Sequence, residues 1–477
     1  MSSQAPLLYE RVARLVEAQI STGTLRANDR IPSVRSMSRT AKVSVSTVVQ
    51  AYLHLENIGL IEARPQSGFY VRPPDPKVLP EPRQKVTRSR KPISIAAEML
   101  EMGREALGRT DIVPLNGAFT SPTLYPNQRL NNLMREVLRE HPMNAGELFP
   151  SPGHPELRRQ IAKRMAIAGA PTDPAHVVIT NGAMDAILQT LAVLCQPGDT
   201  VMVEAPTYFG LLQAIEYLRL KVIEVPNHPG VGIDPDAVRN AAGTPGLTAA
   251  VLMPNFNNPA GTLTPDDAKR TIVAALTANE IPIVEDDIYG DLHYGSVRPV
   301  SLRAFDEAGL VISCGSVSKT IALGYRIGWA VSPTFYADIA RAKFYSSVAC
   351  PTLQQLVLAR YYASGGYDRY LRRLRATICA NSQHFIEAVG RHFPPGTRVA
   401  RPSGGIVLWI ELPQGVDGTE LFRTALASKI GIAPGIVFSA KAGYRNFIRM
   451  NCGLPWSGTI ERAVEKLGRM VGALLKA

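Results

Sequence analysis

The 477-residue sequence contains little cysteine and no apolar run long enough to cross a membrane. Its five cysteines are scattered, with neither metal-ligand spacing nor a disulfide framework, so we expect free thiols and no bound metal. No apolar run approaches the ~18–20 residues of a membrane span, and the chain starts on an amphipathic stretch instead of a secretory signal. These absences favour a cytoplasmic protein that no membrane holds. At this length we expect two or more domains.

The net charge of +12 is unevenly distributed along the chain. Residues 1–91 hold 15 Lys and Arg against 7 Asp and Glu, which places +8 in this segment and +4 in the remainder. Such asymmetry suggests a nucleic-acid-binding segment joined to a near-neutral domain.

The first residues carry the pattern of three helices. Apolar side chains at helical spacing over 8–20 predict the first helix. Ser33 is placed to cap a short second helix, and Ser44 or Ser46 to cap a third helix over 47–57.

A hairpin signature follows the third helix. Short β-like stretches at 60–64 and 69–71 flank a Pro-Gln-Ser-Gly turn at 65–68. Helix, short helix, turn, helix and hairpin predict a small α+β winged helix-turn-helix domain over 1–75, whose third helix can enter the major groove of double-stranded DNA. The alternative is a small helical cap on an enzyme, and the concentrated basic charge weighs against it.

A linker over 76–111 separates this domain from the rest of the chain. Prolines and a basic run, 83–91, indicate a semi-rigid tether, and residues 94–107 are expected to form a helix that enters the large domain. The large domain then occupies 112–477.

One lysine stands out in the large domain. An apolar run, 310–313, leads into Cys-Gly-Ser316-Val-Ser318-Lys319, and Arg326 follows seven residues after the lysine. A lysine can form a Schiff base with a carbonyl cofactor, while hydroxyls and a guanidinium can hold a phosphate. A lone Ser-x-x-Lys also occurs in serine acyl-transfer enzymes, or as a solvated lysine after a strand, so the neighbouring motifs decide the assignment.

Two further apolar runs end in polar side chains. Asp286 ends one of them, and a carboxylate there can keep the nitrogen of a pyridine-type cofactor ring protonated. Tyr289, three residues later, could reach a phenolic oxygen on such a ring. Asn258 follows the other, in a Pro-Asn-Phe-Asn-Asn-Pro-Ala-Gly turn. Alone, these motifs indicate an acidic helix start and a turn. With Lys319 they mark three strand ends, where open α/β sheets gather ligands.

These motifs resemble the fold-type I aminotransferases that use pyridoxal 5′-phosphate (PLP), especially the aromatic and 2-aminoadipate branch, from about residue 113 onward. The resemblance implies a large α/β PLP-dependent transferase domain with a smaller C-terminal α+β domain over about 334–477. It implies that Lys319 binds PLP covalently and that Asp286 partners the pyridine nitrogen. It also implies that Asn258 and Tyr289 contact the phenolic oxygen, with Tyr289, Asp286 and Lys319 as the catalytic residues.

The same resemblance implies further contacts. Tyr208 would stack on the cofactor ring, and Arg449 would grip the α-carboxylate of a substrate or effector. The implied phosphate site consists of Gly182, Ala183, Met184, Ser316, Ser318 and Arg326. A hydroxyl or amide side chain is usual where Ala183 and Met184 stand, so only their backbone contacts carry over. Leu148 and Phe149 stand where the family lends a tyrosine to the neighbouring subunit.

The sequence of residues 8–72 resembles the GntR family of bacterial regulators. The DNA-binding residues that it implies are Arg35, Ser44, Ser46, Thr47, Gln50, Arg64 and Gly68. Many members have an arginine where Val45 stands, so one expected DNA contact is missing.

The two resemblances together make the whole chain similar to the MocR family of PLP-dependent transcription regulators. They imply a homodimer that binds paired DNA half-sites, with an amino acid, another amino compound or PLP itself as the effector. The alternative is a working aminotransferase with an accessory DNA-binding domain. The residues do not separate the two, because sensing an amine through PLP uses the same chemistry as the first half of transamination.

Overall fold

The computed structural model describes residues 8–22, 24–64, 67–72, 79–83, 101, 109–142, 146–441 and 443–476. The chain divides into two compact units, Met1–Lys77 and Val78–Ala477. Apart from Glu101, the helix expected over 94–107 lies outside the described residues, as does most of the predicted tether.

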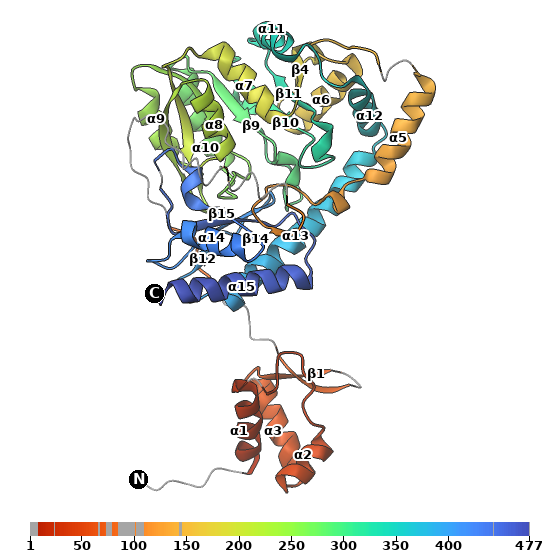
Figure 1. Ribbon diagram of the computed structural model, residues 1–477, viewed down its shortest axis with the longest axis vertical. Helices are drawn as coiled ribbons and strands as arrows, with labels where there is room; N and C mark the ends of the chain where they lie inside the picture. The colour runs from red at the N-terminus through yellow and green to blue at the C-terminus, as the bar shows by residue number, and fades with distance from the viewer. Residues whose placement is uncertain are drawn as a thin grey trace. The chain divides into compact units, whose positions relative to one another are not determined.

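The first unit consists of three helices and a two-stranded antiparallel sheet (Figure 1). Its elements are α1 (Leu8–Ser21), α2 (Val34–Ala41), α3 (Val45–Asn57), β1 (Ile61–Arg64) and β2 (Gly68–Val71). Ser33 caps α2 by accepting a hydrogen bond from Ser36 N. Of the two serines considered for the third helix, Ser44 is the cap, because its hydroxyl accepts from Thr47 N.

A small apolar core holds this unit together. Val16, Val48, Tyr52 and Leu55 are fully buried, so α1 and α3 pack against each other through one face each. The Tyr52 hydroxyl donates to Pro32 O at 2.7 Å and thereby fixes the start of α2 against α3. The opposite face of α3 is left to solvent.

The second unit is organised around an eight-stranded sheet. In spatial order its strands are β4 (Val177–Thr180), β11 (Gly328–Val331), β10 (Val311–Ser316), β9 (Ile283–Asp286), β8 (Leu247–Leu252), β5 (Thr200–Ala205), β6 (Lys221–His228) and β7 (Gly232–Ile233). The five strands from β10 to β6 are parallel to one another, while β11 runs antiparallel to both of its neighbours and β7 antiparallel to β6. The α/β fold that the resemblance implies for this unit is confirmed, with a sheet that is mainly parallel.

Helices cover both faces of this sheet (Figure 1). They are α5 (Asn127–Glu140), α6 (Pro155–Ile167), α7 (Ala183–Leu194), α8 (Phe209–Tyr217), α9 (Pro235–Ala242), α10 (Asp266–Thr277), α11 (Tyr336–Ser347) and α12 (Thr352–Ala363). Along β5, Val201 and Val203 pack with α7 and α8, whereas Met202 between them packs with α9 and α10. Because both faces are buried, the central residues of β5, β8, β9 and β10 are mostly apolar, and the charged residues Glu204, Glu285 and Asp286 stand towards the carboxyl ends of β5 and β9.

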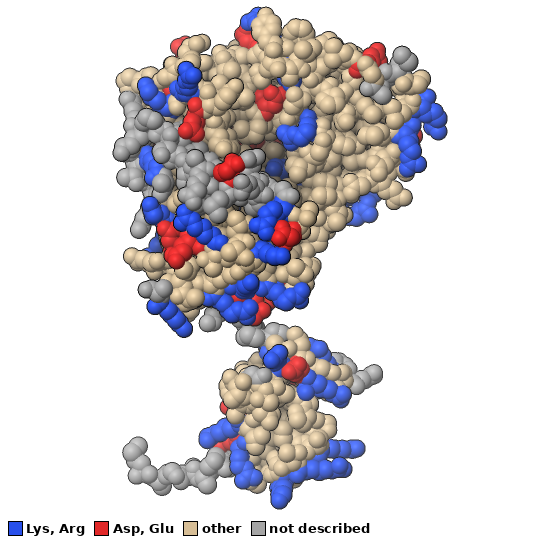
Figure 2. Space-filling view, in the orientation of Figure 1, with Lys and Arg blue, Asp and Glu red and all other residues tan. Residues whose placement is uncertain are grey.

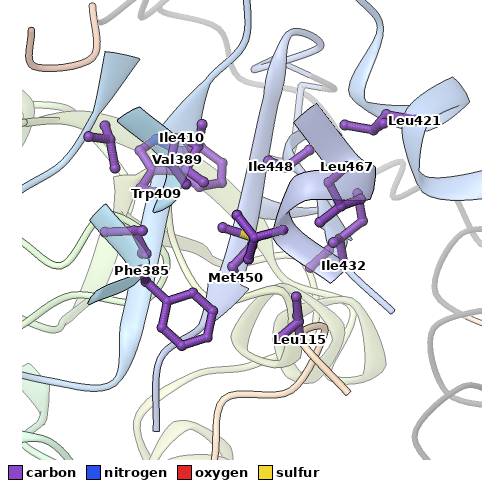
Figure 3. Packing of buried hydrophobic residues seen from close by; sticks show 14 of the residues in the cluster. Leu115, Phe385, Val389, Trp409, Ile410, Leu421, Ile432, Ile448, Met450 and Leu467 are labelled. Carbon is purple, nitrogen blue, oxygen red and sulfur yellow. The ribbon is translucent and has the colours of Figure 1, made fainter. Parts of the chain in front are cut away.

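A smaller C-terminal subdomain packs around a four-stranded sheet. Its elements are α13 (Gly366–His392), β12 (Arg398–Val399), β13 (Val407–Glu411), α14 (Gly418–Ala427), β15 (Ala433–Pro434), β16 (Phe447–Asn451) and α15 (Gly458–Leu474), and β14 (Ile430–Gly431) pairs with β3 (Val113–Pro114). Figure 3 shows Ile448 and Met450 of β16 in the apolar cluster that also contains Phe385 and Leu467. Arg449 lies between them in sequence and therefore faces the other side of the sheet.

The segment 79–83, at the start of the second unit, is fixed to this subdomain. Val399 N donates to Pro80 O at 3.1 Å, Arg398 Nη1 donates to Glu81 O at 3.1 Å, and Arg83 N donates to a Glu411 carboxylate oxygen at 2.5 Å. The first residues of the unit thus run beside β12 and β13.

One helical prediction needs correction. The pattern over 335–363 indicates continuous helix, but α11 ends at Ser347 and α12 begins at Thr352. Pro351 lies in the break, and a proline disfavours helical geometry in the residue before it. Val348, at the end of α11, has φ +56°.

No helix among the described residues is long and apolar enough to span a membrane.

Candidate cofactor site and candidate DNA-binding surface

The sequence-predicted site residues of the large unit come from the carboxyl ends of its strands. Asp286 ends β9 and Ser316 ends β10, and Lys319 follows β10 by three residues. The other members come from the turns after β4, β5 and β8 and from β16 of the subdomain. The structure thereby brings together residues that lie up to 267 positions apart, from Gly182 to Arg449.

Lys319 is held in a desolvated position. Its Nζ donates to Ala118 O at 2.5 Å and lies 5.8 Å from the centre of the Tyr289 ring. Burial, reinforced by the positive charges of Arg449 and Arg326, lowers the pKa of the amine from 10.5 to about 8. A substantial neutral fraction follows near neutral pH, and the neutral amine is the nucleophile that Schiff-base formation requires.

Asp286 lies beside this lysine strand, since Cys314 of β10 is its partner in register. The residue is only 6 % exposed, and burial raises the pKa of its carboxyl to about 7. The hydrogen bond from Ile288 N and the positive charge of Lys319 lower this pKa but do not offset the effect of burial. A cationic ring nitrogen beside this group would restore the carboxylate, because an opposite charge at short range favours ionisation.

Ser316, Ser318 and Arg326 form one hydrogen-bonded cluster. The two serine hydroxyls are 2.8 Å apart, and Arg326 Nη1 donates to Ser318 Oγ at 3.2 Å. Gly182, at φ +96°, precedes α7, and a Cβ there would lie 2.6 Å from Arg326 Nη2. Glycine is therefore required for the close approach of the arginine to the helix start.

The start of α7 supplies backbone donors to the same place. Ala183 and Met184 are the first two residues of the helix, whose N–H groups have no partner within the helix and favour an anion. Asp185 in this first turn would oppose a phosphate, but the fully buried Lys343 pairs with it at 3.0 Å. The pair thus offsets an acid that is unfavourable at a phosphate site.

Asn258 and Tyr289 lie together beneath the subdomain. Both are at least 97 % buried, and the Tyr289 hydroxyl interacts with the Asn258 side chain. Tyr208 precedes α8 at the end of β5 and is partly buried. Burial raises the pKa of both phenols, so both remain protonated and can donate hydrogen bonds at neutral pH.

Arg449 projects from β16 into the site and is 1 % exposed. Its guanidinium donates to Asn258 Oδ1 at 3.1 Å, to Gly117 O at 2.9 Å and to Asn116 O. It also lies 5.2 Å from the Phe438 ring, and its Nε is buried without a hydrogen-bond partner among the described residues. A buried cation with an unused donor is the arrangement that a bidentate carboxylate would complete.

Sequence reasoning missed three groups that shape this site. The carbonyls of Asn116, Gly117 and Ala118 accept from Arg449 and Lys319, yet backbone acceptors leave no signature in a sequence. Phe438 was missed because it is one aromatic residue in an apolar stretch, and nothing in the sequence singles it out. Glu204, fully buried at the end of β5, accepts from the Asn257 side chain at 2.8 Å and so orients the turn that carries Asn258.

These residues fit PLP by the chemistry of their donors. A desolvated amine, a buried carboxyl, a hydroxyl and guanidinium cluster at a helix start, and a guanidinium with a free Nε match the carbonyl, ring nitrogen and phosphate of PLP and the carboxylate of an amino acid.

The candidate DNA-binding surface lies on the first unit. Arg35 of α2 and Gln50 of α3 are exposed, and the hydroxyls of Ser46 and Thr47 lie 2.8 and 2.7 Å from Ser44 Oγ. Figure 2 shows Lys and Arg side chains gathered over α2 and beside the β1–β2 hairpin. Val45 is the first residue of α3 and is 50 % exposed. It stands where members of the GntR family often have arginine.

Arg64 and Gly68 of the hairpin, which the sequence predicts to contact DNA, already make contacts within the first unit. Arg64 donates to Glu62 at 2.7 Å and to Asn28 Oδ1 at 2.8 Å, and its guanidinium lies 4.4 Å from the Tyr70 ring. Gly68 is exposed at φ +110°, and the Arg30 side chain lies against it. A phosphate contact by Arg64 would replace part of these bonds.

Two protein families match the chain. Residues 124–467 match the family described as aminotransferase class I and II, and residues 8–71 match the bacterial regulatory proteins of the gntR family. An Escherichia coli K12 protein described as an uncharacterised HTH-type transcriptional regulator, YdcR, is 36 % identical over 97 % of this chain and 98 % of its own length. The Thermus thermophilus 2-aminoadipate transaminase is 31 % identical over 77 % of this chain and 92 % of its own length.

Solved structures agree with these matches. The Thermus thermophilus α-aminoadipate aminotransferase LysN, in a complex with N-(5′-phosphopyridoxyl)-L-leucine, superposes with a TM-score of 0.74 and 30 % identity, over 80 % of this chain and 97 % of its own. A Pyrococcus horikoshii kynurenine aminotransferase superposes with a TM-score of 0.75 and 26 % identity, over 80 % and 96 %.

Fold and site together define a class of protein in which a GntR-type winged helix is fused to a fold-type I aminotransferase domain. The chain belongs to this class: it is a MocR-type member of the GntR family of transcription regulators. The fold and the solved neighbours imply PLP as the cofactor of its large domain.

Proposed function

We propose that this regulator binds DNA under the control of PLP held by Lys319, alone or together with an amino compound held by Arg449. One observation carries the proposal. Lys319, Asp286 and Arg449 converge in one buried site of a chain whose first unit presents an exposed, basic helix-turn-helix surface.

PLP, when bound, supplies an electrophilic carbonyl and an electron-accepting ring. In this proposal Lys319 would hold the cofactor at that carbonyl through its neutral amine, with loss of water, and Asp286 would keep the ring nitrogen protonated. Asn258 and Tyr289 orient the phenolic oxygen, and Tyr208 covers the ring. Ser316, Ser318 and Arg326, with the N–H groups at Gly182, Ala183 and Met184, hold the phosphate.

Arg449 gives the proposed site its preference for amino acids. Its guanidinium is buried and cannot lose its charge near neutral pH, although burial lowers its pKa to about 10. A compound with an amine and a carboxylate can satisfy the unused Nε while its amine reaches the cofactor. A free amine without a carboxylate would leave the guanidinium without an anion.

The coupling to DNA would pass through the C-terminal subdomain. Arg449 lies on β16 of that subdomain, and its partners Asn116 and Gly117 follow β3, which pairs with β14. Segment 79–83 is bonded to β12 and β13 of the same subdomain. A ligand that favours one position of the subdomain would therefore also act on the chain that leads to the reader, provided that it binds the two positions with different affinity.

The regulator is proposed to act as a homodimer on paired DNA half-sites. An apolar patch supports this, since four exposed apolar side chains gather where residue 150 bridges to residue 349. They are Leu148, Phe344, Tyr345 and Val348. Leu148 and Phe149 carry no hydroxyl, so a neighbouring subunit could not obtain one for its phosphate from this position.

We also propose a cytoplasmic location, which access to DNA and the five free cysteines support.

A working aminotransferase with an accessory DNA-binding domain is the second candidate. The complete set of Lys319, Asp286 and Arg449 favours it, since these groups suffice on paper for transamination, and related proteins are named as transaminases. A third form of the proposal has PLP itself as the effector, without an amino acid.

The test follows the absorbance of PLP-loaded protein as individual amino acids are added, with and without 2-oxoglutarate. A sensor shows a spectral change for one or a few compounds, without sustained keto-acid production when the acceptor is present. That compound should also change the affinity for operator DNA. Rapid multiple turnover would instead identify an enzyme. Spectral silence towards every amino acid, with DNA binding that depends on PLP, would identify PLP as the effector.

A further inference from the structure

A second cavity lies outside the residues assigned to PLP and the amino compound. It has a volume of about 760 Å³ and is bounded by the start of α5, the end of α12 and the first half of α13. Neither Lys319, Asp286, Asn258 nor Arg449 lines it. Its lining is strongly basic.

Three arginines supply the charge of this cavity. Arg369 and Arg373 are one helical turn apart on α13, and Arg129 is the third residue of α5. Within the described part of the chain none of the three forms an ion pair. Asp368, the acid whose charge acts on Tyr361 of the lining, pairs with Arg164 at 2.6 Å. The N–H groups at the start of α5 add a partial positive charge.

Tyr361 adds a hydroxyl to the lining of the same cavity. No described residue forms a hydrogen bond with this hydroxyl, so a ligand or water in the cavity can accept one from it. Burial raises the pKa of this phenol to about 12, and the charges of Arg129 and Arg373 act in the opposite direction.

The back of the cavity adjoins the loop of Lys319. Tyr370 donates to Thr320 O at 2.7 Å, and Tyr125 donates to Ser318 O at 3.2 Å. Both tyrosines line the cavity, so two of its walls hold the carbonyls on either side of Lys319. A ligand that fixes these walls would also fix the loop that carries the amine.

We propose that this cavity is a binding site for a small anion with two or more negative charges, such as a phosphorylated or polycarboxylate metabolite. Three converging guanidinium groups and one free hydroxyl match the oxygens of such a ligand. The chain's own basic segment 83–91 has the wrong charge to fill the cavity. The site is separate from the phosphate cluster of Ser316, Ser318 and Arg326, which PLP would occupy.

The test uses full-length protein loaded with PLP, so that the cofactor's phosphate site is already filled. Sodium pyrophosphate and sodium citrate are titrated separately by calorimetry at constant ionic strength. One-to-one binding per chain is expected for at least one of them, and the better titrant shows whether phosphate or carboxylate oxygens are preferred. Binding of neither would overturn the proposal.

The variants identify the place of binding. Arg369→Gln combined with Arg373→Gln should weaken binding by about tenfold or more, because charge-assisted bonds are lost, and Tyr361→Phe should weaken it by a smaller factor. Arg372→Gln is the matched control, since Arg372 is exposed on the same helix but lines a different cavity. Equal weakening by Arg372→Gln, or unchanged binding in the double variant, would show nonspecific attraction only and overturn the site.

The link to Lys319 has its own measurement. Saturating pyrophosphate or citrate should change the pH midpoint of the cofactor absorbance in the wild type and have no such effect in the double variant. An unchanged midpoint in saturated wild-type protein would refute the link.

Discussion

At the scale of single residues, two cations dominate the cofactor site. Lys319 and Arg449 are both desolvated, and the charge of Arg449 further destabilises the charged form of Lys319. The lysine can respond by losing its proton, whereas the arginine remains charged and must be paired. This difference separates their proposed roles: a reactive amine and a permanent anchor for a carboxylate.

The first prediction concerns the covalent attachment of PLP. Lys319→Ala should abolish the Schiff-base absorbance of the purified protein, because no other amine replaces it at the end of β10. Lys163→Ala, at an exposed position of α6, is the control and should retain the band. An unchanged band in Lys319→Ala would refute the assignment of PLP to this lysine.

The second prediction concerns pH. The pKa of Lys319 is lowered to about 8, so its reactive neutral form increases as pH rises through this value. The rate of PLP uptake by cofactor-depleted protein should increase through about pH 8 and level off about one unit above. Stopped-flow absorbance at a fixed PLP concentration measures it. A rate that continues to increase towards pH 10 would show a lysine with an ordinary pKa.

Much of the residue-level site could be predicted from sequence, and the reason is specific. Lys319, Asp286 and Asn258 each follow an apolar run that can only be a buried strand, so their common edge follows from the parallel sheet. The carbonyls of Asn116–Ala118 could not be predicted, because every residue carries a carbonyl. The pairing of Asp185 with Lys343 joins α7 to α11, and no local pattern specifies it.

At the scale of elements, β16 serves the core and the site with alternate residues. Ile448 and Met450 pack in the cluster of Figure 3, while Arg449 faces Phe438 and Asn258. The strand alternation predictable from sequence is therefore enough to separate stability from ligand binding at neighbouring positions.

The third prediction separates these two roles. Met450→Ala should lower the free energy of unfolding by about 2–5 kcal/mol, because the side chain is fully buried, and leave the preference among amino acids unchanged. Arg449→Lys should weaken amino-acid binding by about tenfold or more, since the bidentate geometry is lost. Denaturant unfolding and spectral titration measure the two effects. The same loss of binding in both variants would show that the strand acts only through stability.

The fourth prediction concerns α3. Val45, Val49 and Leu53 form an exposed apolar row at four-residue spacing along this helix. Val45→Arg should strengthen DNA binding and shift the selected sequence towards guanine, because arginine contacts the major-groove edge of guanine in bidentate fashion. Selection from randomised duplexes measures the shift, with Leu53→Arg near the far end of α3 as the control. Identical selected sequences for wild type and Val45→Arg would place Val45 away from the bases.

Element boundaries show where sequence prediction fails. The sequence does not distinguish Ser44 from Ser46 as the cap of α3, and only the hydrogen bond from Thr47 N to Ser44 decides it. The helix over 335–363 divides at Pro351, because a short extended segment there pairs with residue 150. Periodicity predicts which residues are helical but not a break that tertiary contact imposes.

At the scale of the whole molecule, charge and fold divide the labour between two units. The first unit carries an exposed basic surface (Figure 2), and the second carries the site built from buried residues such as Asp286 and Arg449. Composition predicts only part of this division, because residues 1–77 carry +4 and residues 78–91, at the start of the second unit, carry another +4, against +4 in the remaining 386 residues. The coupling between the two functions could not be predicted, since it depends on contacts such as those of segment 79–83.

The fifth prediction concerns DNA binding. Full-length protein should bind operator DNA with an affinity that falls steeply with salt, by about 10³-fold between ~50 and ~200 mM if about six phosphates are contacted. A variant without residues 1–77 should lose this binding. Electrophoretic or fluorescence titrations at several salt concentrations measure both. Equal binding by the shortened variant would refute the assignment of the reader.

The carbonyls of Asn116, Gly117 and Ala118 have a consequence for signal fidelity. They already accept from both cations, so a simple carboxylate such as acetate can bond to the unused Nε of Arg449 but must displace a carbonyl to gain a further hydrogen bond there. An anion that meets Arg449 alone therefore gains about one net hydrogen bond by entering. A compound that bonds covalently through its amine and also grips Arg449 exceeds this threshold. The three carbonyls would thus suppress false triggering of the regulator by the background of small ions in a cell.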